Sequence, residues 1–203
     1  MKRTVSVLQL LIAALVLVGC ASAPNREVRF HEESGVTWAS MDEAIVLARS
    51  TPQYTVAARD YIYIGPVETN RLGELEHYLW LGAASTVDRE LRGESAPDSA
   101  TLVLVVDGTP IALPLTTWDA EFATSPYNAP VPITGAQSAR VSLDQIQRIA
   151  RAESVEVRVV SEGDSSVRYE LWHGSWPSWT SFPAERVGQE LDARAGTASL
   201  SDQ

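Results

Sequence analysis

The stretch 101–115, TLVLVVDGTPIALPL, restricts the fold of this chain more than any other segment. Two apolar runs flank Asp107-Gly108, a dipeptide that favours a two-residue turn between antiparallel strands. The pairs that such a turn predicts are Val106–Thr109, Leu104–Ile111 and Leu102–Leu113. In this register the nitrogens of Pro110 and Pro114 point away from the partner strand, as prolines do on an edge strand. The segment therefore predicts a β-hairpin with one edge strand.

A second hairpin is predicted over 155–173, where apolar residues alternate with charged ones in two runs. A three-residue loop over 163–165 would place Arg158 opposite Glu170. A shift by two residues would instead place Arg158 opposite Arg168 and Glu156 opposite Glu170. Like charges directly opposite one another are destabilising, so we favour the first register.

Two further strands are predicted near 58–64 and 75–83, on either side of the polar segment 65–73, GPVETNRLG. We interpret that segment as the loop between them. Arg71 within it is a candidate for binding a carboxylate, since a guanidinium forms paired hydrogen bonds with that group. An ordinary solvated connection is the alternative, and the composition of the loop favours it.

Helices are indicated by two capping patterns. Ser40 and Ser142 are each followed three residues later by Glu or Gln, which is the capping-box arrangement. The second pattern precedes a helix over 143–152 with apolar residues on one face. A third helix is predicted to begin near Pro183, because proline suits the first turn of a helix.

These elements predict one α+β domain over 36–192, with a mainly antiparallel sheet of about six strands and helices packed on one face. Residues 20–35 are polar and are interpreted as a tether, and residues 193–203 as a flexible tail. The proline-containing stretch 119–141 is long for a structureless loop. It either covers the sheet edge left by the proline strand or binds something, and the sequence does not decide between these alternatives.

The N-terminus has the layout of an export signal. Lys2 and Arg3 precede a run over 5–18 that is apolar apart from two residues. As a helix this run would be about 21 Å long. The hydrocarbon core of a bilayer is roughly 30 Å thick, so the run is too short for a permanent transmembrane helix.

Two cleavage sites follow the apolar run. Ala21-Ser22-Ala23 fits a secretory site, but cleavage there would leave Pro24 first in the mature chain. The segment Leu17-Val18-Gly19-Cys20 resembles the lipobox of bacterial lipoproteins. That resemblance implies a signal peptide over 1–19, cleavage between Gly19 and Cys20, and diacylglycerol on the Cys20 thiol with a further acyl chain such as palmitate on its amino group.

The remaining features of the N-terminus agree with lipidation. Cys20 is the only cysteine, so no intramolecular disulfide is possible and lipidation would consume the free thiol. Several acyl chains give stable membrane anchoring. In Gram-negative lipoproteins an aspartate after the cysteine favours the inner membrane. Here that residue is Ala21, so for a Gram-negative host the resemblance implies the outer membrane, with the domain on its periplasmic face.

The chain is acidic, with a formal net charge of −10, which becomes −12 when the two N-terminal cations are removed with the signal. Such a charge disfavours binding to nucleic acid or to anionic lipid surfaces. Membrane attachment is therefore expected from the acyl chains on Cys20.

No standard catalytic motif is present: the chain lacks GxSxG, a Walker loop, GxGxxG and HExxH. The three histidines are far apart in the sequence. His31-Glu32-Glu33 is the nearest arrangement to a metal-ligand cluster, but it lacks ligand spacing and falls in the predicted tether. We expect no metal and no cofactor.

The densest unusual feature is 171–182, LWHGSWPSWTSF, which contains Trp172, His173, Trp176 and Trp179. One interpretation is an exposed aromatic platform for a glycan, peptidoglycan or the apolar surface of a partner protein. The other is a plug that closes one end of the core. Large aromatic side chains are more often packed than displayed, so we favour the plug.

The sequence thus predicts a non-catalytic binding or scaffolding lipoprotein of the outer membrane. Its expected partners are the membrane, through Cys20, and an envelope protein or peptidoglycan. The alternative is an envelope hydrolase acting on cell wall or lipid, with His173 or His77 as base beside a carboxylate such as Asp60.

Overall fold

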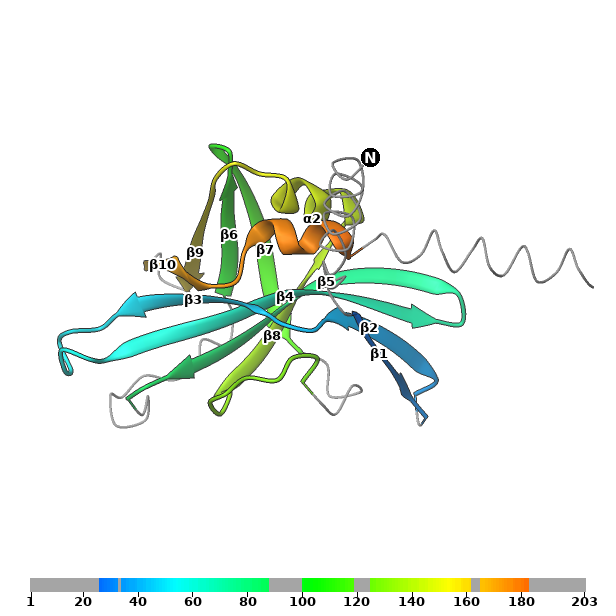
Figure 1. The fold of residues 1–203 in the computed structure, drawn as a ribbon, viewed down its shortest axis with the longest axis horizontal. Helices are drawn as coiled ribbons and strands as arrows, with labels where there is room; N and C mark the ends of the chain where they lie inside the picture. Colours follow the sequence, from blue (N-terminus) through cyan, green and yellow to red (C-terminus); the bar gives the residue numbers. More distant parts are fainter. Residues whose placement is uncertain (1–25, 33, 88–99, 119–124, 162–164, 183–203) are drawn as a thin grey trace, which may run out of the picture.

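The computed structural model describes residues 26–32, 34–87, 100–118, 125–161 and 165–182 (Figure 1). The predicted signal peptide over 1–19, Cys20, the tail over 193–203 and the helix near Pro183 lie outside the described residues. Within the described part, ten strands form one antiparallel sheet. They are β1 (Arg26–His31), β2 (Val36–Met41), β3 (Ile45–Ser50), β4 (Arg59–Arg71), β5 (Glu74–Ser85), β6 (Ala100–Val106), β7 (Thr109–Thr117), β8 (Gly135–Val141), β9 (Val155–Ser161) and β10 (Ser166–His173).

Eight of these strands close into a barrel. The order runs from β4 through β3, β10, β9, β6, β7 and β8 to β5, and β5 pairs again with β4. The remaining strands, β1 and β2, extend the sheet from the far half of β4. Closure leaves few free sheet edges, which is how many all-β proteins avoid unpaired backbone groups.

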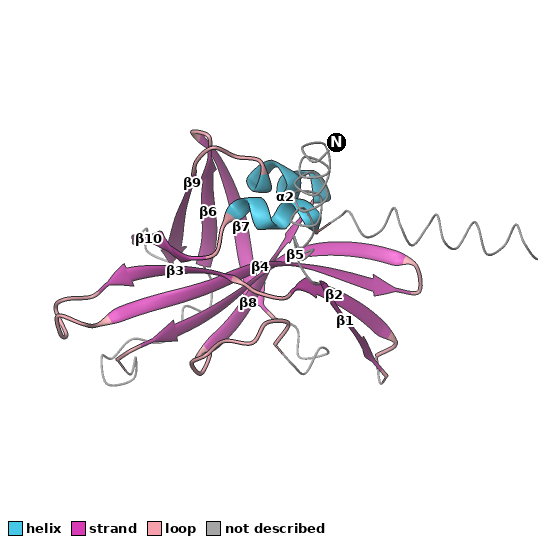
Figure 2. Cartoon of the chain, in the orientation of Figure 1, coloured by secondary structure: helices cyan, strands magenta, loops and turns pink. Residues whose placement is uncertain are grey.

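The predicted α+β class is therefore wrong. The described residues contain ten strands and only two short helices, α2 (Leu143–Ala150) and the 3₁₀ helix η3 (Trp176–Ser181) (Figure 2). The missed strands come from segments interpreted as tether, helix or loop. β1 lies within 20–35, β2 includes Ser40 itself, β3 replaces the helix expected after Ser40, and β8 lies within 119–141. The hydroxyl of Ser40 is buried and donates to the Pro126 carbonyl at 3.0 Å, so it caps no helix.

The hairpin at 101–115 is confirmed. β6 and β7 pair in the predicted register, including Val106 with Thr109. Asp107 and Gly108 have φ of +48° and +79°, as a primed two-residue turn requires. The other edge of β7, which faces away from β6, pairs with β8 only at the last two residues of β7. The nitrogens of both prolines therefore face an edge that no described strand pairs with at those positions.

The register predicted for the second hairpin is wrong. β9 and β10 place Arg168 opposite Arg158, which is the arrangement that we rejected. Glu156 makes it tolerable, since its carboxylate forms ion pairs with both arginines. The charge of Glu156, on the same face, therefore offsets the repulsion between Arg158 and Arg168. Part of the predicted loop, 163–164, lies outside the described residues.

The segment 65–73 is mostly strand instead of the predicted loop. β4 continues through Gly65-Pro66, and its turn to β5 is Leu72-Gly73, both with positive φ. β3 pairs with β4 up to Ile64, and β2 pairs with it from Val67 onward. The Pro66 nitrogen faces the gap between those two strands, so its missing N–H costs no ladder bond.

The helices pack together over the barrel, above the long hairpin of β4 and β5 in Figure 1. The predicted capping box of α2 is confirmed, with reciprocal hydrogen bonds between Ser142 and Gln145. Ile146 and Ile149 of α2 and Trp179 of η3 are fully buried. The helices thus fill the core on that side of the sheet.

The two faces of β4 and β5 have different coverings. On one face His77 contacts Phe182, directly after η3, with ring centroids 6.5 Å apart. On the other face Tyr127 packs on Trp80, with ring centroids 5.5 Å apart, and its hydroxyl donates to the Pro66 carbonyl at 2.6 Å. Burial raises the pKa of Tyr127 well above its usual value, so this phenol stays protonated. Tyr127 therefore covers the middle of that face and leaves its two ends open.

Candidate functional site

An aromatic groove of about 510 Å³ lies at one end of the face that Tyr127 covers. We call it the Trp172 groove. Its walls come from the start of β3, from β4, from the end of β10 and from the segment before β8. It is lined by Glu43, Ala44, Val46, Tyr61, Tyr63, Thr86, Asn128, Pro130, Val131, Trp172 and His173.

A local irregularity of β10 explains why two consecutive residues line this groove. Successive side chains of a regular strand point to opposite faces. The pairing of β10 with β3 shifts between Leu171 and His173, as it does at a β-bulge. Trp172 and His173 consequently border the same groove.

Trp172 is exposed but held in place. Its side chain is 59% exposed. The ring of Tyr61 meets it edge-on, with centroids 6.2 Å apart and an interplanar angle of 75°. The Arg59 guanidinium lies 5.4 Å from the ring centroid, within the range of cation–π attraction. The indole therefore presents a fixed aromatic surface to solvent.

The floor of the groove includes two tyrosines from β4. Tyr61 and Tyr63 are two residues apart and so lie on the same face of the strand. Burial and, to a smaller extent, the neighbouring Tyr61 raise the pKa of Tyr63 above its usual value. The Tyr63 phenol therefore stays protonated at neutral pH and can both donate and accept hydrogen bonds.

The other two tryptophans of the predicted platform are not in the groove. Trp176 and Trp179 are buried, and their rings pack edge to face with centroids 5.1 Å apart. They belong to the core, as the plug interpretation predicts. The aromatic segment is thus divided: Trp172 and His173 border a cavity, while the two tryptophans of η3 fill the interior.

Arg71 lies at the opposite end of β4, in a second cavity of about 560 Å³. Most of the residues that line this cavity carry polar groups. The Tyr78 hydroxyl donates to Glu76 at 2.6 Å, and Glu76 also pairs with Arg140. The ring of Trp118 meets Tyr78 edge-on. Arg71 is therefore brought together with two carboxylates, Glu74 and Glu76, and not with Trp172.

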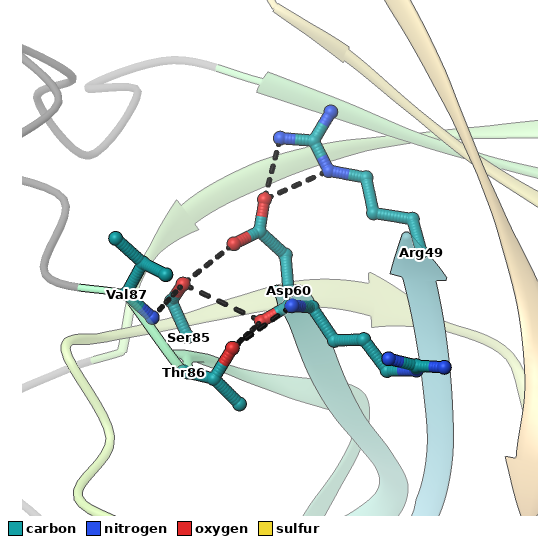
Figure 3. A network of polar contacts seen from close by, with 6 residues as sticks. Arg49, Asp60, Ser85, Thr86 and Val87 are labelled. Carbon is teal, nitrogen blue, oxygen red and sulfur yellow. Dashed lines mark hydrogen bonds and ion pairs between the residues drawn. The ribbon is translucent and has the colours of Figure 1, made fainter. Parts of the chain in front are cut away.

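The structure does not assemble the predicted hydrolase pair. Asp60 accepts hydrogen bonds from Arg49 and from Ser85, as Figure 3 shows. His77 instead contacts Glu68 at 3.2 Å, eight residues along β4 from Asp60. His173 approaches Glu43 at 3.8 Å, with both side chains largely exposed. In the described part of the chain, no group of three or more metal-ligating side chains is placed to hold an ion.

Comparison with known proteins gave no match, whether with family models, curated proteins or solved structures. The described residues contain no helix with the length and hydropathy needed to cross a bilayer. Function must therefore be argued from the geometry of the chain itself.

The sequence carries little local signal for most of the Trp172 groove. One signal was available, since the alternation in Asp60-Tyr-Ile-Tyr-Ile64 places both tyrosines on one face. The contributions of Asn128, Pro130 and Val131 had no such signal. These residues reach the groove because their segment is anchored across the sheet by the hydrogen bonds of Tyr127 with Pro66 and of Ser40 with Pro126.

Proposed function

We propose that this chain is a lipid-anchored, non-catalytic binding protein of the bacterial outer membrane whose ligand is a glycan chain of the cell wall. The exposed and fixed indole of Trp172, in a groove with two tyrosines, is the observation that carries the proposal. The domain stands on the periplasmic face of the membrane, held by acyl chains on Cys20.

The lining of the groove suits a sugar. A sugar ring has a face of C–H groups, which packs on an aromatic ring, and an edge of hydroxyls, which needs donors and acceptors. Trp172 and Tyr61 offer aromatic surface, while Tyr63 and Asn128 offer groups that both donate and accept hydrogen bonds. Specific pockets combine apolar surface with a few placed polar groups in this way.

Replacing Trp172 with alanine is expected to weaken binding to purified peptidoglycan sacculi by roughly tenfold or more, because a central tryptophan often dominates binding energy. The measurement is co-sedimentation of the full-length protein with sacculi. Phe30→Ala is the matched control, since Phe30 is 62% exposed but lies in β1, outside the groove. Equal binding by the Trp172→Ala and Phe30→Ala proteins would rule out the groove as the glycan site.

Replacing Cys20 with alanine is expected to move the protein from the detergent phase to the aqueous phase of a Triton X-114 separation. The acyl chains supply the main hydrophobic anchor, and the acidic net charge disfavours electrostatic attraction to anionic lipid in their place. The measurement is the fraction of protein in each phase, with the wild type beside it. Recovery of the wild type in the aqueous phase would contradict lipid anchoring.

A further inference from the structure

Four of the nine exposed large apolar side chains in the described part of the chain lie at the end of the sheet farthest from the Trp172 groove. Val28 and Phe30 of β1 are 53% and 62% exposed, and Leu75 of β5 is 41% exposed. Leu72, in the turn between β4 and β5, is 97% exposed. Large apolar residues grouped this way on a surface indicate contact with a partner or a membrane.

The strand register places Val28, Phe30 and Leu75 on one face at the same end of the sheet. Residues directly opposite in paired strands share a face. One row across the four strands consists of Phe30, Thr37, Asn70 and Leu75. Val28 lies in the next row of the same face, and Leu72 lies just beyond the end of the row. We call Val28, Phe30, Leu72 and Leu75 the apolar end.

The apolar end is within reach of the proposed anchor. Arg26, where β1 begins, follows Cys20 by six positions in the sequence. At 3.3–3.6 Å per residue, this segment spans at most about 20 Å. β1 itself carries Val28 and Phe30, so a lipid on Cys20 keeps these side chains close to the bilayer surface.

We propose that the apolar end docks on the lipid bilayer and orients the domain on it. This inference rests on the lipid anchor of the proposed function. The apolar side chains enter the boundary between headgroups and acyl chains, as interfacial segments do, and the acyl chains supply most of the affinity. Apolar contact is the suitable mode because the net charge of the full chain, −10, becomes −12 once Lys2 and Arg3 are removed with the signal, and this charge disfavours electrostatic attraction to anionic lipid.

Docking in this way would direct the glycan groove toward the cell wall. β4 spans 13 residues and is about 40 Å long. Leu72 follows its last residue, whereas Tyr61 of the Trp172 groove is near its first. The groove would therefore face away from the membrane, where a glycan chain is accessible.

Site-specific labelling tests the proposal in the full-length protein. Lipidation blocks the Cys20 thiol, so an introduced cysteine is the only site for a nitrobenzoxadiazole label. Leu72→Cys places the label at the apolar end. Val56→Cys is the matched control, because Val56 is also almost fully exposed but precedes β4 at its other end. Both proteins are reconstituted on vesicles of phosphatidylethanolamine and phosphatidylglycerol.

On the vesicles, we expect iodide quenching of the label at position 72 to fall severalfold. Nitroxide-labelled lipids should quench the same label. The label at position 56 should remain accessible to iodide. Adding Phe30→Asp and Val28→Asp should restore iodide quenching at position 72. Equal iodide quenching at both positions on vesicles would overturn the docking proposal. Protection of position 72 in vesicle-free, unlipidated Cys20→Ala protein would also overturn it, because a second copy would then cover the apolar end.

The same experiment separates this proposal from the anchor on which it rests. A wild-type protein whose Cys20 reacts with maleimide and does not bind vesicles has no lipid anchor, which would refute the proposed function itself. A wild-type protein that is unreactive and vesicle-bound retains the anchor, and the two labels then decide the orientation.

Discussion

Replacing Asp60 with alanine is expected to lower the free energy of unfolding by about 3 kcal/mol, because it removes a buried carboxylate and leaves the charge of the partly buried Arg49 uncompensated. The Asp60 carboxylate is 4% exposed. One of its oxygens accepts from Arg49 Nε at 2.9 Å and Nη2 at 2.6 Å, and the other accepts from Ser85 Oγ at 2.7 Å. The measurement is urea denaturation of the variant and the wild type.

The strand register places the three side chains of this network on neighbouring strands of the barrel. Arg49, Asp60 and Ser85 are direct neighbours on β3, β4 and β5. The backbone N–H of Val87 also donates to Ser85 Oγ, which extends the network past the end of β5 (Figure 3). Loss of the carboxylate therefore affects three strands at once.

Glu27→Ala provides the control for Asp60→Ala. Glu27 pairs with Arg29 at 2.7 Å, but both side chains are substantially exposed, at 44% and 32%. Exposed pairs contribute about 0–1 kcal/mol. If the Asp60 and Glu27 variants lose similar stability, the buried network does not stabilise the barrel.

Local structure could be predicted from this sequence where neighbouring residues decide it. The turn at Asp107-Gly108 and the capping box at Ser142 depend on a few adjacent residues, and both are confirmed. The same capping pattern at Ser40 failed because a distant group, the Pro126 carbonyl, binds that hydroxyl inside the sheet. The register at Arg158 failed for a related reason, since Glu156 supplies the charge that a pairwise comparison omits.

Closure of the barrel had no local signal. It depends on the pairing of β5 with β8 and of β3 with β10, and these strands are distant in sequence. Gly65-Pro66 is a turn signal by composition, yet it lies within a continuous strand because β2 and β3 leave a gap opposite it. One wall of the Trp172 groove is similarly non-local, since the segment before β8 forms it.

A second large loss of stability is expected from Gly65→Ala, at the position where β2 and β3 leave a gap beside β4. A methyl group on Gly65 would lie 2.3 Å from Cζ of Tyr127, far inside van der Waals contact. Gly65 has no positive φ, so the backbone alone would accept alanine. The cost therefore comes from overpacking, and we expect a loss of about 3 kcal/mol in the free energy of unfolding.

Tyr127 has little freedom to move away from that methyl group. Its hydroxyl is fixed to the Pro66 carbonyl, its ring lies against Trp80, and the side chain is 3% exposed. Shifting it would break a buried hydrogen bond and pull the segment before β8 off the sheet.

A double-mutant cycle isolates the contact between Gly65 and Tyr127, because contacting residues show non-additive effects. In a Tyr127→Ala background, Gly65→Ala should cost less than about 1 kcal/mol, since alanine is then tolerated in the strand. An unchanged cost in that background would mean that Tyr127 is not the group that excludes a side chain at position 65.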